Sequence, residues 1–209
     1  NLWLLALCQG LLSTNNVVFI AINGLVGLQL APFGWMATLP VMGYVVGGAL
    51  STPLVAASQA RWGRRGSFQL GLVVAFLSAA LCAWAAFSAH FWLLCAATVI
   101  AGYYNANGQL YRFAAAELTA PAFREKAVSL VLAGGLLGAV AGPNLASGTR
   151  NLFPVPFAGA YLALMLVALL AMVCMAGVHF ESLPAPAPGA AAPPAGRPVS
   201  ALLRQPAFA

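Results

Sequence analysis

The sequence contains no aspartate and only three glutamates, and charged residues of both signs make up 6% of its 209 residues. A water-soluble domain carries about 25% charged residues, so this chain cannot cover a solvent-exposed surface of ordinary charge density. Hydrophobic residues reach 62% instead. This composition is typical of an integral membrane protein.

Other absences narrow the function. The four cysteines lie in apolar runs without paired spacing, which argues against a disulfide framework and a CxxC metal site. We therefore predict no metal ligands and no cofactor. The net charge of +6 would suit a nucleic-acid partner, but a basic face with interleaved aromatics is missing. No nucleophile, base and orienting group occur together, so we expect no enzyme.

Six apolar runs are long enough to cross a bilayer, whose core of about 30 Å needs about 20 helical residues. They cover residues 2–30, 35–58, 67–88, 91–115, 127–149 and 156–180. We predict an all-α membrane protein with a six-helix transmembrane bundle over residues 1–180. Residues 181–209 are rich in proline and alanine and are predicted to be a linker that ends with the start of a seventh helix.

Lysine and arginine are distributed unevenly over the connections between these runs. Alternate connections lie on opposite sides of the membrane, and one side receives Arg61, Arg64, Arg65, Arg112, Arg124, Lys126, Arg197 and Arg204. The other side receives Arg150 alone. Because basic residues gather in cytoplasmic loops, we place both ends of the chain in the cytoplasm.

The first and fourth runs each carry polar residues on one helical face. The first face holds Gln9, Ser13, Asn16 and Asn23, and the second holds Thr98, Gly102, Asn105, Gln109 and Arg112. Polar groups in hydrocarbon must face partners or a water-filled cavity. We predict that such a cavity is lined by Gln9, Asn16, Asn23, Asn105, Gln109 and Arg112. Interhelical hydrogen bonding is an equal alternative, and Arg112 has a second alternative role as an interfacial anchor.

The stretch AASQARWGRRG, residues 56–66, places Arg61, Gly63, Arg64 and Arg65 in a turn between two apolar runs. Glu117 and Arg124 follow the fourth run. We predict that Glu117 pairs with Arg61 or Arg65 in a charged cluster to which Arg124 also belongs. The alternative is a solvated ion pair of little energetic value.

The fifth run contains Gly134, Gly138 and Gly142 at intervals of four, followed by Pro143. Glycines at this spacing form a ridge on which another helix can pack closely. Proline removes one backbone donor and permits a bend. We therefore predict a packing and hinge site at Gly138, Gly142 and Pro143.

These motifs resemble those of the major facilitator superfamily. Residues 61–65, RWGRR, match its loop motif, although Ala60 stands where that motif has aspartate, and GAVAGP at 138–143 is similar to its fifth-helix motif. The resemblance covers nearly the whole chain and implies the amino-terminal half of a twelve-helix transporter. It further implies inverted three-helix repeats, a missing carboxy-terminal six-helix half, and alternating access around a midplane site. By the same resemblance, the polar faces of the first and fourth runs line the substrate pathway. The cluster of Arg61, Gly63, Arg64, Arg65, Glu117 and Arg124 would act as a conformational lock.

The segments ALCQGLLSTNNV, LYRFAAAE and GRRG resemble a bacterial branch that includes copper importers and riboflavin transporters. The resemblance implies a secondary transporter of a small solute in the inner membrane, with copper import as one specific hypothesis. A proton-coupled drug or metabolite exporter is an alternative, favoured by the fifth-helix motif and opposed by the lack of a mid-membrane carboxylate. A nontransporting membrane scaffold or assembly factor is a third hypothesis.

Overall fold

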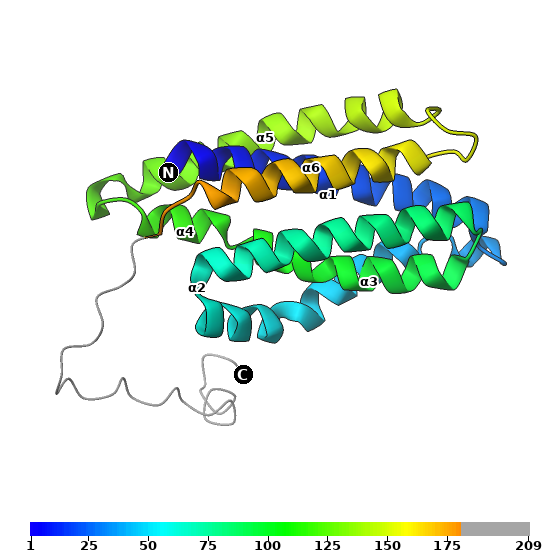
Figure 1. Ribbon diagram of the computed structural model, residues 1–209, viewed down its shortest axis with the longest axis horizontal. Coiled ribbons are helices and arrows are strands. Elements are labelled where there is room, and N and C mark those ends of the chain that lie inside the picture. The colour runs from blue at the N-terminus through cyan, green and yellow to red at the C-terminus, as the bar shows by residue number, and fades with distance from the viewer. Residues whose placement is uncertain (181–209) are drawn as a thin grey trace.

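The computed structural model describes residues 1–180, which form a helical bundle without strands in that range (Figure 1). Its elements are α1 (Leu2–Leu30), η1 (Gly34–Met36), α2 (Leu39–Phe87), α3 (Phe91–Gly108), α4 (Tyr111–Glu117), η2 (Pro121–Phe123), α5 (Arg124–Thr149) and α6 (Ala158–Ala176). The all-α fold class is confirmed. The predicted linker and seventh helix, residues 181–209, lie outside the described residues.

Helix α2 contains 49 residues, but Gly63 divides it with φ 69° and ψ −179°. The chain reverses there, so Ser58 and Ser67 on the two arms lie with their hydroxyl oxygens 2.6 Å apart. The predicted turn between the two apolar runs is present, but it is shorter than residues 56–66, because helix extends up to Gly63 from both sides. Glycine enters this backbone region without the steric cost that a Cβ imposes.

Four helical stretches are long and apolar enough to cross a membrane: 2–30, 34–87, 121–149 and 158–176. The second contains 54 residues, about 80 Å at 1.5 Å per residue. Because the chain reverses at Gly63, this stretch has the length for two crossings. Within the described residues, the structure therefore does not show six separate spanning helices as predicted.

The predicted fourth span, 91–115, is interrupted. Helix α3 ends at Gly108 and α4 begins at Tyr111. The Asn107 side chain donates to the Ser67 carbonyl at 2.5 Å, which fixes α3 against the second arm of α2. Asparagine and glycine are weak helix formers, and their adjacent placement at 107–108 accounts for a break that the apolar run conceals.

Two helix pairs pack backbone to backbone through glycine. A methyl group added at Gly138 of α5 would overlap the Gly10 carbonyl of α1, and one added at Gly102 of α3 would overlap the Gly47 backbone of α2. With the two arms of α2 counted separately and α4 counted with α3, the helices form two three-helix units. The first unit is α1 with the two arms of α2, and the second is α3 with α5 and α6. Each contact thus joins the first helix of one unit to the second helix of the other.

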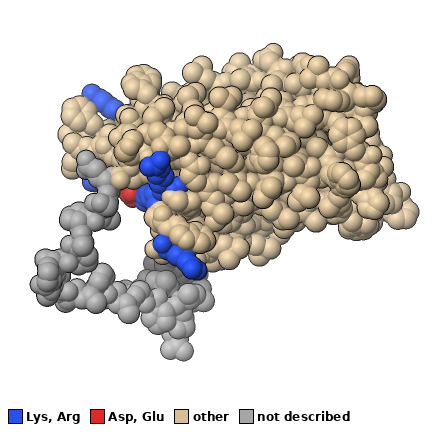
Figure 2. Space-filling view, in the orientation of Figure 1, with Lys and Arg blue, Asp and Glu red and all other residues tan. Residues whose placement is uncertain are grey.

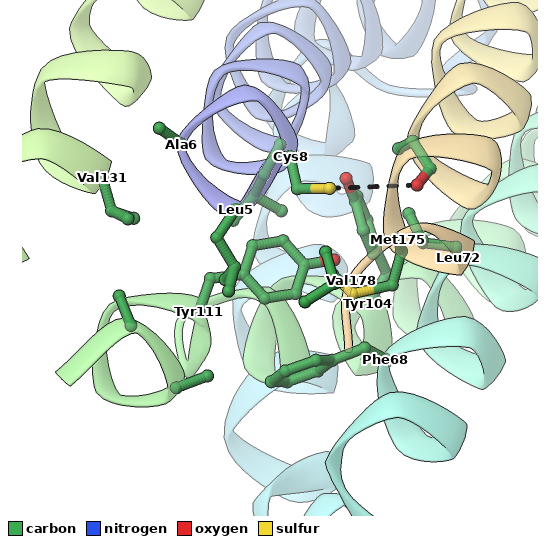
Figure 3. Close-up of a cluster of buried hydrophobic side chains, with 14 of the residues drawn as sticks. Leu5, Ala6, Cys8, Phe68, Leu72, Tyr104, Tyr111, Val131, Met175 and Val178 are labelled. Atoms are coloured by element: carbon green, nitrogen blue, oxygen red, sulfur yellow. Dashed lines mark hydrogen bonds between the residues drawn. The ribbon is translucent and has the colours of Figure 1, made fainter. Parts of the chain in front are cut away.

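The core at the end of the bundle where the chain begins joins all six α-helices, with Tyr104 from α3 and Val131 from α5 (Figure 3). Phe68 and Tyr111 meet edge to face, with ring centroids 4.8 Å apart. Cys8 lies in the same cluster, with its sulfur 3.9 Å from the Ala171 carbonyl oxygen. This packing fixes the short helix α4 against its neighbours and thereby positions Glu117 at its end.

Candidate functional site

Four polar side chains from three helices form a hydrogen-bonded cluster inside the bundle. Asn16 of α1 donates to the side-chain oxygen of Asn105 of α3 at 3.1 Å, and Gln109 donates to the same oxygen at 3.3 Å. The buried Tyr44 hydroxyl of α2 donates to the Asn16 side-chain oxygen. We call Asn16, Tyr44, Asn105 and Gln109 the amide cluster.

The amide cluster retains unused hydrogen-bonding groups. Within residues 1–180, the side-chain nitrogen of Asn105 and the side-chain oxygen of Gln109 take part in no hydrogen bond. Asn105 is half-buried and Gln109 is exposed, so both groups are accessible from outside the half-bundle. The arrangement offers neutral donors and acceptors, which can bind an uncharged polar solute but cannot supply a charged group.

The three other predicted pathway residues lie apart from this cluster. Asn23 is fully buried, where it donates to the Phe19 carbonyl at 2.8 Å and accepts from Tyr161 of α6 at 2.8 Å. The interhelical bonding left open for the polar faces is therefore present at Asn23. Gln9 lies against Gly135 of α5. Arg112 is exposed on α4, with its guanidinium carbon 5.1 Å from the Phe113 ring centroid.

Glu117 pairs with Arg64 rather than with Arg61 or Arg65. The Arg64 Nε donates to Glu117 Oε2 at 2.5 Å, a terminal nitrogen donates to Oε1, and Arg64 also contacts Gln59 at 3.3 Å. The predicted partners were wrong because the turn occupies only Gly63, so Arg64 begins the second arm and points toward α4. The two-bond geometry is typical of specific arginine–carboxylate pairing.

The other predicted lock residues have different surroundings. Arg65 donates to the Ala176 carbonyl in the last turn of α6 at 2.5 Å, where a cation complements the helix dipole. Arg61 has its guanidinium carbon 5.4 Å from the Trp62 ring centroid. Arg124 is exposed, and its side chain forms no hydrogen bond or ion pair with the described residues. The predicted grouping of Arg124 with Glu117 therefore lacks a contact.

At the predicted packing site, α1 lies directly on the glycine face of α5. A Cβ at Gly142 would lie 3.0 Å from the Val17 side chain. Pro143 is exposed, and α5 continues as one helix through it to Thr149. The glycine face thus contacts another helix, while a hinge at Pro143 stays a prediction.

Tyr44 and a second buried polar network were not predicted from the sequence. Tyr103 donates to Ser58 at 2.8 Å, and Ser67 donates to Asn107 at 3.3 Å. A signal was present, since hydroxyl and amide groups in apolar helices require partners. The sequence alone does not show which helix supplies these hydrogen-bond partners.

Charge is concentrated at one end of the molecule. Figure 2 shows lysine and arginine side chains gathered at the end where the Gly63 turn lies, with a glutamate between them, and a far end that is free of charge in that view. Arg150 belongs to the opposite end, just after α5. Long apolar helices, a charged end and an uncharged amide cluster between helices define a polytopic membrane protein with a candidate solute site.

The sequence profile described as Major Facilitator Superfamily matches residues 2–209. The chain belongs to this superfamily of membrane transporters. It is 33% identical over 214 aligned positions to a riboflavin transporter of Brucella anthropi, and the alignment covers 100% of this chain and 52% of that relative. The chain thus spans about half the length of the curated relative that it matches, consistent with an amino-terminal half.

Proposed function

We propose that this chain forms the amino-terminal half of a secondary transporter that moves a small solute across a bacterial inner membrane by alternating access. The amide cluster is the observation that carries the proposal. Two of its members, Asn16 and Asn105, come from α1 and α3, the opening helices of the two three-helix units. In a transporter built from such repeats, the site forms between the halves near the midplane.

The proposed solute is riboflavin, the substrate in the name of the bacterial relative. Riboflavin is uncharged and carries an imide edge and a hydroxylated side chain, which are groups that amides and a tyrosine hydroxyl can bind. The acidic residues of the chain are Glu117, Glu125 and Glu181, and the first two lie at helix ends. A neutral solute fits this composition better than a copper ion, which the comparison does not support.

The Arg64–Glu117 pair is proposed as the conformational lock. It joins the start of the second α2 arm to the end of α4. Both side chains are partly exposed, so the pair can open without burying an unpaired charge. We propose the cytoplasm for this charged end, because basic residues favour that side.

The experiment is uptake of labelled riboflavin by cells that cannot synthesise it, with and without the full-length gene. We expect gene-dependent uptake and growth at low riboflavin. Gln109→Leu should lower uptake at an unchanged membrane level, because it removes an accessible amide. Gln29→Leu is the matched control, since Gln29 is exposed at the end of α1.

Three outcomes would contradict parts of this proposal. Gene-dependent copper uptake without riboflavin uptake would restore the copper hypothesis. Riboflavin loss from preloaded cells would favour an exporter. A full-length protein that binds and transports neither solute, and whose amide-cluster variants match the native protein in a wider solute screen, would favour the scaffold hypothesis.

A further inference from the structure

A pocket lies beside the Gly63 turn, and no residue of the amide cluster lines it. Its volume is about 280 Å³, and it is lined by Leu54, Ala57, Ser58, Arg61, Trp62, Leu70 and Tyr103. The pocket thus combines one cation, two aromatic rings and hydroxyl groups with aliphatic side chains. Such a combination is typical of the level at which a membrane interface meets hydrocarbon.

Arg61 is the available cation of the turn. Arg64 is bound by Glu117 and Arg65 by the Ala176 carbonyl. Within residues 1–180, the Arg61 guanidinium forms no hydrogen bond or ion pair, and its only recorded partner is the Trp62 ring, 5.4 Å away. An arginine over an aromatic ring keeps its N–H groups free for an anion.

The pocket and the amide cluster use opposite faces of α3. Successive residues of an α-helix are about 100° apart, so Tyr103 and Asn105 of α3 lie on opposite faces. The Tyr103 hydroxyl donates to Ser58 at 2.8 Å, which leaves its oxygen as an acceptor at the pocket wall. Two lining residues, Leu54 and Trp62, are 61% and 54% exposed. Leu50 and Val46, which precede Leu54 by one and two turns of α2, are 67% and 50% exposed and extend this apolar surface along the arm.

We propose that this pocket binds the phosphate headgroup of an anionic phospholipid, with Arg61 on the phosphate and with Leu54 and Leu70 along the acyl chains. Charge complementarity and position both favour this occupant. The pocket joins a free cation at the charged end of the molecule to an apolar wall that runs into the membrane. A free phosphate ion would use Arg61 alone and gain nothing from that wall.

The test is native mass spectrometry of the purified full-length protein, titrated in detergent with dioleoyl phosphatidylglycerol, dioleoyl phosphatidylcholine or inorganic phosphate. We expect phosphatidylglycerol to bind more tightly than phosphatidylcholine. Arg61→Gln should weaken phosphatidylglycerol binding about fivefold, as expected for one cation at a membrane surface. Arg61→Lys should retain most of the affinity because it keeps the charge.

Arg150→Gln is the matched control, because Arg150 also lies over an aromatic ring, with its guanidinium carbon 5.1 Å from the Phe157 centroid. It should leave phosphatidylglycerol binding unchanged. Equal binding of the two lipids, or equal binding by the Arg61→Gln and native proteins, would overturn the proposal. Inorganic phosphate that displaces phosphatidylglycerol at equal concentration would also overturn it, by assigning the pocket to the free ion.

Discussion

Asn16 of α1 donates its side-chain N–H to the Asn105 side-chain oxygen of α3 at 3.1 Å, although 89 positions separate the two residues. Each residue has another partner, Tyr44 for Asn16 and Gln109 for Asn105. The bond therefore lies at the centre of the amide cluster. It also connects the first helices of the two three-helix units.

Asn16→Leu and Asn105→Leu should each reduce riboflavin uptake by about three- to twentyfold, the equivalent of about 0.6 to 1.7 kcal/mol for one interhelical hydrogen bond. The double variant should be little worse than the more severe single one, because both changes remove the same bond. Uptake kinetics at matched membrane levels measure this coupling. Asn144→Leu is the control, since Asn144 is exposed and bonds only within α5. Fully additive effects of the two substitutions on uptake would show that the two residues act independently and would contradict this coupling.

Reversing the charge of Arg64 should change the balance of conformations more than the stability. The Arg64 and Glu117 side chains are 27% and 57% exposed, and exposed ion pairs contribute about 1 kcal/mol or less. Alkylation of a cysteine introduced at Gln109 of the full-length transporter reports the opening of the site. Arg64→Glu should alter its rate, and the exchanged pair Arg64→Glu with Glu117→Arg should restore it. Lys126→Gln is the control, and an unaltered rate in Arg64→Glu would exclude the lock.

Gly63→Ala should destabilise the protein by about 1 to 3 kcal/mol, because φ 69° with ψ −179° is a region that almost only glycine occupies. Denaturation in sodium dodecyl sulfate measures the change. Gly34→Ala is a suitable control, because nothing lies within 4 Å of the added methyl group and its φ is not positive. Equal stability of the two variants would show that the turn can be made in another way.

Gly138→Ala should destabilise the contact between α1 and α5 by about 1 to 3 kcal/mol, the usual cost of overpacking. The added methyl group meets the Gly10 backbone carbonyl, which cannot move aside as a flexible side chain can. Gly148→Ala lies in the same helix with nothing within 4 Å and should be neutral. Thermal unfolding in detergent compares the two, and a neutral Gly138→Ala would contradict the observed close approach.

Tyr161→Phe tests the role of Asn23. The change removes the 2.8 Å hydrogen bond from the Tyr161 hydroxyl and should cost about 0.6 to 1.7 kcal/mol of stability. Riboflavin uptake per folded molecule should stay close to native, because Asn23 bonds inside the half-bundle. A large fall in uptake at native stability would instead support the prediction that Asn23 lines the substrate pathway.

Apolar run length predicted individual helices well. The first run, 2–30, has the same bounds as α1, because Pro32 disfavours helical backbone at the preceding residue, Ala31. The fourth run concealed the break after Gly108, since Tyr111 and the alanines after it continue the apolar composition. Helix breaks that depend on a tertiary contact, such as Asn107 with Ser67, leave only a weak local signal.

Polar residues within membrane helices were found from the sequence, but their partners were not. Helical spacing correctly put Asn16 and Asn105 on polar faces, whereas the bond between them depends on how α1 and α3 cross. The pairing of Glu117 depended on the backbone at Gly63, because the direction of each neighbouring arginine follows from that one residue. Both relationships arise only when the helices are assembled.

The two arms of α2 are joined by the single residue Gly63, so a change of angle at this turn moves each arm as a whole. Each arm, 39–62 and 64–87, is about 36 Å long at 1.5 Å per residue. A tilt of about 10° around the turn would displace the far end of an arm by about 6 Å on this geometry. If the proposed lock at Arg64 opens, a small change of angle at the charged end would therefore give a larger displacement at the opposite end of each arm.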